Sequence, residues 1–246
     1  MRVLGVDLAT EPSGTAGCWL TFDDEGARAE VVEDRLDDGA LIRLIASSDR
    51  AAIDSPFGWP EPFYAAISQW RDTASFPTGS REPLRLRATD LYVKARTLTP
   101  YSVSADKIGA LAMRCALLLT GVADAEKTRI DRVDGKAIEC YPSAALYRFG
   151  FSRAALKNAK TDHDVRRRLL GEILARAPWL KVDEHEQAKL IRVGHSFDAF
   201  IAGLVARAAA VRKTDRPPPQ LAALAAIEGW IHLPHANTLA SLSKAR

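Results

Sequence analysis

The sequence predicts an α/β fold built on a mixed sheet, with strands that run in both directions. Three observations near the start of the chain indicate this fold. Short apolar runs rich in β-branched residues recur, an acidic turn joins two of these runs, and a helical pattern separates them from the next run. A hairpin that is followed by a helix and a new strand is typical of a mixed sheet.

The first three strands are expected at 3–6, 15–22 and 27–33. Val3 and Val6 belong to an apolar run that ends at Asp7, and small and polar residues follow as an exit turn. The acidic stretch 23–26 separates the second and third runs, which indicates a hairpin.

A helix and a fourth strand come next. Asp37 and Asp38 precede an apolar pattern of helical period, and acidic residues stabilise the positive N-terminal end of a helix. The following apolar run ends at Asp54. Pro56 prevents this strand from continuing, because proline has no backbone N–H to donate.

Residues 57–135 are predicted to form a largely helical insertion within a single domain that covers 1–246. Prolines and glycines punctuate this segment, and a helical pattern covers 108–119 near its end. The segment is longer than a plain connection between two elements. We expect Ser104 to cap the helix at 108–119.

The second half of the chain returns to the sheet and then becomes helical. A short apolar run ends at Glu139 and is expected to be the fifth strand. Helices are predicted at 143–149, 164–177, 195–211 and 221–227.

The composition is that of an ordinary soluble globular protein, with 47% hydrophobic and 26% charged residues. The net charge of +3 permits an anionic partner without demanding one. Three widely separated cysteines indicate neither a disulfide framework nor a zinc site. No apolar run reaches the roughly 18 residues that span a bilayer, and no signal peptide is evident, so we expect a cytoplasmic protein with no membrane partner.

Four acidic residues stand where secondary structure elements end or begin. Asp7, Asp54 and Glu139 close apolar strands, and Asp198 lies near the start of an apolar helix. Carboxylates delivered from separate elements suit Mg²⁺ or Mn²⁺, which prefer hard oxygen ligands. The alternative is that each acid caps its own turn or helix.

Basic residues and one histidine complete the candidate site. His195 lies one helical turn before Asp198 and could move a proton, although it could equally hydrogen-bond to the backbone. The pair Arg87 and Asp90 could meet a phosphate or satisfy each other. The candidate substrate-binding residues are Arg81, Arg87, Asp90, Lys94, Arg96 and Lys160, and Arg85 alternates with the first two. The alternative for each basic stretch is a solvated surface.

The order strand-strand-strand-helix-strand, with acids on strands one and four and on a late helix, is the layout of the ribonuclease H-like fold. In that fold the acids hold two metal ions for hydrolysis of a phosphodiester. The sequence also resembles the family of predicted RNase H-like nucleases called domain of unknown function 429. The motifs that carry the resemblance are Gly5-Val6-Asp7-Leu8-Ala9, Ile53-Asp54-Ser55-Pro56-Phe57-Gly58, Arg87-Ala88-Thr89-Asp90, Ser102-Val103-Ser104, Glu139-Cys140-Tyr141-Pro142, Phe197-Asp198-Ala199 and Glu228-Gly229-Trp230-Ile231.

The resemblance implies a ribonuclease H-like mixed five-stranded sheet flanked by helices, and a metal-dependent nuclease. Asp7, Asp54 and Asp198 would form the acidic triad, with Glu139 as a fourth ligand. We therefore expect a Mg²⁺- or Mn²⁺-dependent enzyme that acts on nucleic acid, either RNA or DNA.

Two other function classes start from the same residues. Actin-like and sugar-kinase-type ATP phosphotransferases use a related unit with an Asp on the first strand. Here no glycine follows Asp7 directly, and the second half has no glycine-rich stretch for adenosine. The third possibility is a catalytically inactive module of the same fold that binds nucleic acid or protein.

Overall fold

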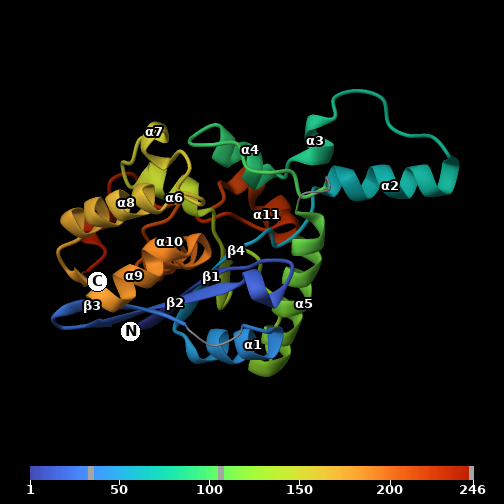
Figure 1. The fold of residues 1–246 in the computed structure, drawn as a ribbon. Coiled ribbons are helices and arrows are strands. Elements are labelled where there is room, and N and C mark those ends of the chain that lie inside the picture. Colours follow the sequence, from blue (N-terminus) through green and yellow to red (C-terminus); the bar gives the residue numbers. More distant parts are fainter. Residues whose placement is uncertain (33–35, 105–107, 244–246) are drawn as a thin grey trace.

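A mixed six-stranded sheet carries helices on both faces in the computed structural model, which describes residues 1–32, 36–104 and 108–243 (Figure 1). The strands are β1 (Arg2–Asp7), β2 (Ala16–Asp23), β3 (Gly26–Val31), β4 (Arg50–Asp54), β5 (Ala137–Glu139) and β6 (Leu180–Lys181). The α/β class and the first five strands agree with the sequence prediction. The predicted end of the third strand at residue 33 lies outside the described residues.

The strand order is β5-β4-β1-β2-β3-β6. The hairpin strands β1, β2 and β3 pair antiparallel, whereas β4 is parallel to both β1 and β5. In the β1–β4 pair, Asp7 is the register partner of Asp54. The carboxyl ends of these two central strands therefore lie side by side.

The sheet has one strand more than the five predicted. β6 contains only two residues and pairs parallel with the edge of β3. Gly26, at a φ of +137°, allows the chain before β6 to approach β3, because a Cβ at this position would lie 2.2 Å from the carbonyl oxygen of Trp179. A strand of this length has no alternation for a sequence pattern to detect.

One face of the sheet is covered by α10 (Gly194–Ala210), which is buried along nearly its whole length. Gly5 of β1 allows this packing, because a Cβ there would lie 2.0 Å from the carbonyl oxygen of Ala199. Further helices pack around α10, namely α6 (Pro142–Arg148), α8 (His163–Arg176) and α9 (Glu184–Arg192). The sequence predicted α6, α8 and α10 but not α9.

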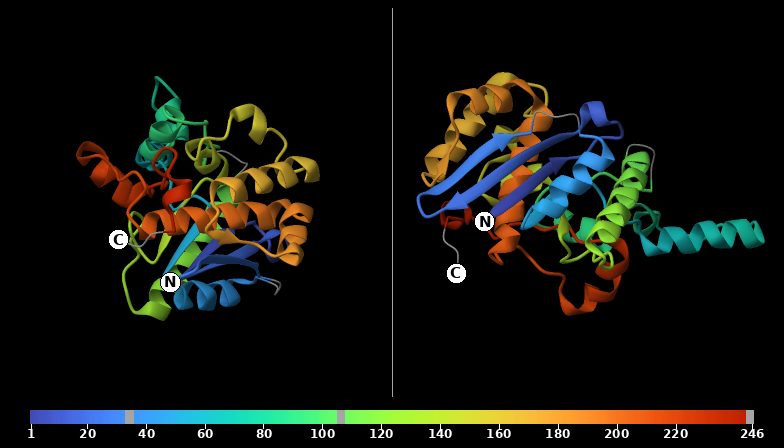
Figure 2. Two further views of the ribbon diagram at one scale, coloured as in Figure 1. Left: turned by 90° about the vertical axis from the view of Figure 1, so that its left-hand side faces the viewer. Right: turned by 90° about the horizontal axis from the view of Figure 1, so that it is seen from below.

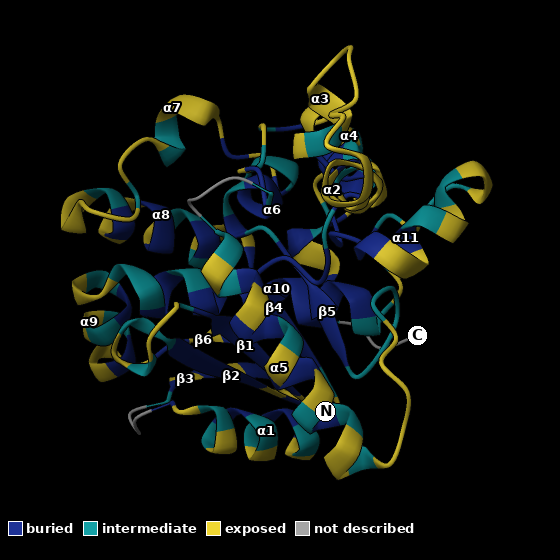
Figure 3. Ribbon diagram, turned by 90° about the vertical axis from the view of Figure 1, so that its right-hand side faces the viewer, coloured by how far each residue is buried: buried dark blue, intermediate teal, exposed yellow. Residues whose placement is uncertain are grey.

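The other face is covered by α1 (Asp38–Ser47) and α5 (Gly109–Glu126). Leu41 of α1 and Leu118 of α5 belong to one buried apolar cluster with Leu4 of β1. The helix α5 lies in the predicted insertion, yet it builds a layer of the core. Figure 3 shows the buried strands between these helical layers.

Ser104 does not cap α5, which corrects the sequence prediction. The helix begins at Gly109 with Ile108 as its N-cap, and the Ile108 side chain makes no capping hydrogen bond. The Ser104 hydroxyl instead donates to the carbonyl oxygen of Leu84. Residues 105–107, which were expected to lead into the helix, lie outside the described residues.

The rest of the insertion consists of α2 (Glu61–Thr73), α3 (Glu82–Arg85) and α4 (Ala88–Lys94). The helix α2 extends away from the body of the molecule, as Figures 1 and 2 show. The remaining helices are α7 (Arg153–Leu156) and α11 (Ala222–Glu228), with 3₁₀ turns at Pro12–Gly14, Pro219–Leu221 and Leu239–Ser241. None of the helices in the described ranges is long and apolar enough to cross a membrane.

Candidate functional site: a carboxylate cavity

Three of the predicted acidic residues meet at one cavity of about 530 Å³. Asp7 and Asp54 reach it from the carboxyl ends of the paired strands β1 and β4. Asp198 reaches it from the second turn of α10. The close packing of α10 on Gly5 places this turn beside the end of β1, so the local sequence of β1 sets both the position of Asp7 and the approach of Asp198.

Lys160 connects two of these acids. Its ammonium nitrogen lies 3.8 Å from Oδ2 of Asp7 and 3.7 Å from Oδ2 of Asp198. The two carboxylate oxygens are therefore no farther apart than the sum of these distances. The Lys160 side chain is 57% exposed, so solvent and solutes can reach the ammonium group.

The backbone around Lys160 is fixed by a buried arginine. The guanidinium of Arg166 donates to the carbonyl oxygens of Ala159 and Lys160, and also to those of Ile191 and Arg192. These bonds tie the segment that carries Lys160 to the end of α9. Arg166 is itself only 1% exposed.

His195 contacts the Asp7 carboxylate directly. Its Nδ1 lies 2.5 Å from Oδ2 of Asp7 and donates to it, while 40% of the histidine side chain remains exposed. His195 comes from the start of α10, one turn before Asp198. The structure thus brings the predicted histidine and two of the predicted acids together.

Burial and like charge raise the pKa values of two of the carboxyl groups. Burial is the main cause for Asp54, whose pKa lies well above the usual range, and the nearby Asp7 and Asp198 add to it. Burial and Asp7 raise the pKa of Asp198 to about 6, against the opposing effect of Lys160. Within the described residues, no donor makes a hydrogen bond or ion pair with the Asp54 carboxylate. This site has an excess of negative charge that a cation would relieve.

The donor chemistry fits Mg²⁺ or Mn²⁺, because carboxylate oxygens are hard ligands. As the side chains lie, however, no group of three or more His, Cys, Asp or Glu residues in the described ranges could hold a metal ion. Lys160 supplies the positive charge between Asp7 and Asp198. A divalent ion would have to displace its ammonium group and draw the carboxylates inward.

Glu139 also lines the cavity, but its oxygens are engaged elsewhere. The Arg87 guanidinium donates to both of them, at 2.8 Å and 2.6 Å, and the backbone N–H of Phe57 donates to one. Arg87 also holds both oxygens of Asp90. The sequence predicted that Glu139 is available as a metal ligand, and that Arg87 and Asp90 meet substrate. In the structure these three side chains bind one another instead, and Arg87 is only 2% exposed.

A family model described as "Protein of unknown function (DUF429)" matches residues 5–222. The chain belongs to this DUF429 family. No curated protein and no solved structure matches it. The DUF429 match begins in β1 and includes all four predicted acidic residues.

The other basic residues that the sequence analysis named for this DUF429 chain lie outside the cavity. Lys94 pairs with Glu82 at 2.5 Å, and the Arg96 guanidinium stacks 3.5 Å from the centre of the Tyr92 ring. Arg81 and Arg85 are exposed on and beside α3. The structure does not bring these four residues to the carboxylates.

Two tyrosines of the cavity were not predicted as site residues. Tyr141 follows the fifth strand, and burial together with the charge of Asp54 raises its pKa to about 12. Tyr101 lies close enough to Tyr141 to influence its ionisation, and 64% of it is exposed. The sequence feature that could have identified Tyr141 as a site residue is its place in the motif Glu139-Cys140-Tyr141-Pro142, close to the predicted ligand Glu139.

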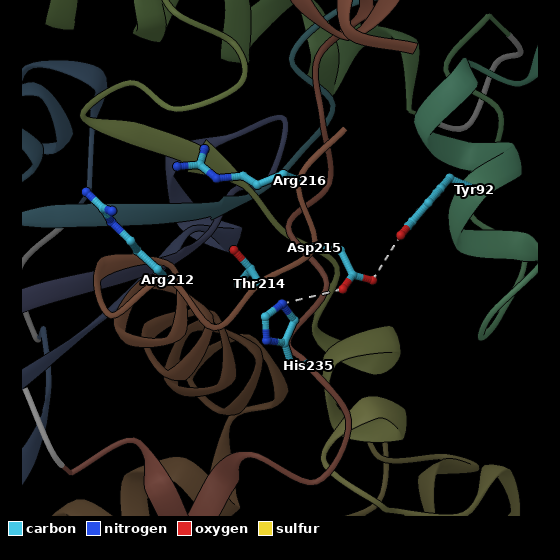
Figure 4. A pocket seen from close by; sticks show the side chains of 6 residues that line it. All are labelled: Tyr92, Arg212, Thr214, Asp215, Arg216 and His235. Carbon is cyan, nitrogen blue, oxygen red and sulfur yellow. Dashed lines mark hydrogen bonds and ion pairs between the residues drawn. The ribbon is translucent and has the colours of Figure 1, made fainter. Parts of the chain in front are cut away.

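A second pocket, of about 460 Å³, lies elsewhere on the surface and contains none of the predicted site residues (Figure 4). Its charged groups largely neutralise one another. Asp215 accepts from Tyr92 and pairs with Arg148 and His235, while Arg216 pairs with Asp134 outside the pocket. The carboxylate cavity is therefore the stronger candidate for chemistry.

Proposed function

We propose that this protein is a metal-dependent nuclease that hydrolyses phosphodiester bonds at the carboxylate cavity. The observation that carries the proposal is the convergence of Asp7, Asp54 and Asp198, from three separate elements, on one solvent-reachable cavity. The order of the first five strands and the placement of these acids support the resemblance to the ribonuclease H-like fold noted from the sequence.

Asp7, Asp54 and Asp198 would hold Mg²⁺ or Mn²⁺. When bound, such an ion lowers the pKa of a water molecule and stabilises charge on the phosphate oxygens. The raised pKa values of Asp54 and Asp198 favour this role, since a bound cation would stabilise the charged form of both carboxyl groups.

His195 and Lys160 would act on protons and on substrate charge. The Nδ1 of His195 is held by Asp7, which leaves Nε2 as the ring atom that can exchange a proton. Once released from the carboxylates, the Lys160 ammonium group can pair with a phosphate oxygen of the substrate. Glu139 would act indirectly, by fixing Arg87 and the backbone at Phe57 behind the cavity.

The direct test compares the purified protein with its Asp7→Asn variant on labelled oligonucleotides in Mn²⁺. An amide is a much weaker ligand than a carboxylate, so we expect cleavage to fall at least about a hundredfold, with the chain still folded. The matched control is Asp24→Asn, which makes the same change at an exposed turn. Equal cleavage by Asp7→Asn and the parent would refute the proposal. Mg²⁺-dependent ATP turnover without phosphodiester cleavage would favour a phosphotransferase instead.

A further inference from the structure

The shape of the carboxylate cavity bears on which phosphodiesters can enter it. Its volume of about 530 Å³ falls in the range of about 300–1,000 Å³ that is usual for small-molecule sites. Recognition of a duplex instead requires many phosphate contacts spread along a basic surface. The size of the cavity suits one nucleotide unit.

The lining of the cavity combines two kinds of side chain. Asp7, Asp54 and Asp198 are acidic, and Tyr141 lies close to Asp54 and Asp198. Apolar and aromatic side chains form much of the remaining lining, among them Leu8, Pro56, Tyr101, Ile108, Leu111 and Leu156. A phosphate bound at the carboxylates would therefore leave its attached nucleoside among apolar side chains and a tyrosine ring, and aromatic rings stack on bases of any sequence.

Within the described residues, positive charge at the cavity is scarce, because Arg87 and Lys160 are the only lysine or arginine side chains that line it there. Arg87 is buried and holds Glu139 and Asp90, so its charge is already compensated. Of these two, Lys160 is the one exposed enough to meet a substrate phosphate. One such group among the described residues matches a single phosphodiester better than a continuous strand backbone.

We propose that the substrate is a phosphodiester carried by a single nucleotide unit, either as a small free ester or as the terminal nucleotide of a strand, with the nucleoside against Tyr101 and the apolar wall. This inference rests on the proposed function. In the reaction, a water oxygen forms the new bond to phosphorus while the bond to the leaving oxygen breaks. One proton of the water ends on the leaving oxygen, so atoms and charge balance.

The test uses three substrates in Mn²⁺: the p-nitrophenyl ester of thymidine 5′-phosphate, a linear single-stranded oligonucleotide, and the same oligonucleotide closed into a circle. We expect cleavage of the first two and release of mononucleotides from the linear strand. The circle should be opened at least about a hundredfold more slowly, because it has no terminal nucleotide.

The outcomes separate this inference from the proposed function. Opening of the circle as fast as cleavage of the linear strand, in an Asp7-dependent manner, would overturn the inference while the nuclease proposal stands. Cleavage of none of these substrates, nor of a duplex, would remove both.

A binding measurement tests the placement of the nucleoside without catalysis. In Mn²⁺, calorimetry with thymidine 5′-monophosphate, which has no phosphodiester bond to cleave, should show binding that Tyr101→Ala weakens about tenfold, as loss of one stacking contact predicts. Tyr101→Phe should restore it because the ring is kept. Tyr64→Ala is the matched control, since Tyr64 is 47% exposed on α2 and outside the cavity. Equal affinity of Tyr101→Ala and the parent would overturn this placement of the nucleoside.

Discussion

Lys160 acts as an internal cation of the carboxylate cavity, and replacing it should change how the site binds metal. Lys160→Met removes the ammonium group that lies between Asp7 and Asp198. We expect Mn²⁺ affinity to rise severalfold, because the ion no longer competes with a resident charge. Calorimetric titration with Mn²⁺ measures this, with Lys157→Met as an exposed control. Unchanged affinity in Lys160→Met would show that the lysine does not occupy the cation position.

His232 should make the protein less stable in mild acid. It is buried, its Nε2 donates to the carbonyl oxygen of Val133, and its Nδ1 accepts from the Thr214 hydroxyl, so the ring is neutral. Burial lowers its pKa to about 4. The unfolded chain takes up a proton near pH 6.5, before the folded protein does, so stability falls as the pH drops from about 6.5 towards 4.

The magnitude can be measured by urea unfolding at pH 7 and pH 4.5. The parent should lose about 2 kcal/mol more than His232→Gln between these pH values, because the variant has no ring to titrate. The comparison with the variant cancels the contributions of the other titrating groups. An equal loss in both proteins would contradict the neutral buried histidine.

At the residue scale, the sequence predicted which acidic residues line the cavity, but not which side chains form hydrogen bonds and ion pairs with them. Asp7 and Asp54 could be predicted to meet because both end parallel neighbouring strands. The pairing of Arg87 with Glu139 joins residues 52 positions apart. No local pattern encodes such a contact, so the sequence indicated only a phosphate or the nearby Asp90 as partners of Arg87.

At the element scale, the contact between β1 and α10 should be sensitive to one methyl group. Gly5→Ala places a Cβ 2.0 Å from the Ala199 carbonyl oxygen, so the helix must move. We expect a loss of about 3 kcal/mol of stability from this overpacking, and lower activity because Asp198 moves away from Asp7.

The matched control makes the same substitution where space is free. Gly171 lies in α8, and a Cβ there meets nothing within 4 Å. Gly171→Ala should therefore stabilise the protein by about 0.5–1 kcal/mol, since alanine is the better helix former. Equal effects of the two substitutions in chemical unfolding would contradict the close contact at Gly5.

The elements that the sequence predicted are those with strong periodic patterns or clear end signals. The strands β1 to β5 and the helices α1, α5, α6, α8, α10 and α11 belong to this group. The short β6 was missed because it has too few residues for a pattern. The sequence also gave no reason to expect that α5, within the insertion, builds a core layer with α1.

At the scale of the whole molecule, the distribution of charge predicts a weak dependence of ligand binding on salt. The net charge is only +3, and among the residues that the structure describes one accessible lysine lines the cavity. Binding of a short single strand should therefore lose affinity with a slope near −0.7 to −1.5 in log–log form, as for one or two phosphates. Fluorescence anisotropy between about 50 and 200 mM salt measures this slope.

Lys160→Met should reduce that slope, whereas Lys94→Met should not, because Lys94 pairs with Glu82 away from the cavity. A slope of about −3 or steeper that falls in Lys94→Met would indicate that the basic residues of α3 and α4 contact the strand after all.

The most direct test of the account is an anomalous-scattering map from crystals soaked in Mn²⁺. The account predicts a peak within ligand distance of the Asp7, Asp54 and Asp198 carboxylates, with the Lys160 ammonium group moved away from them. Absence of a peak at these residues at saturating Mn²⁺, with Lys160 still between Asp7 and Asp198, would contradict it.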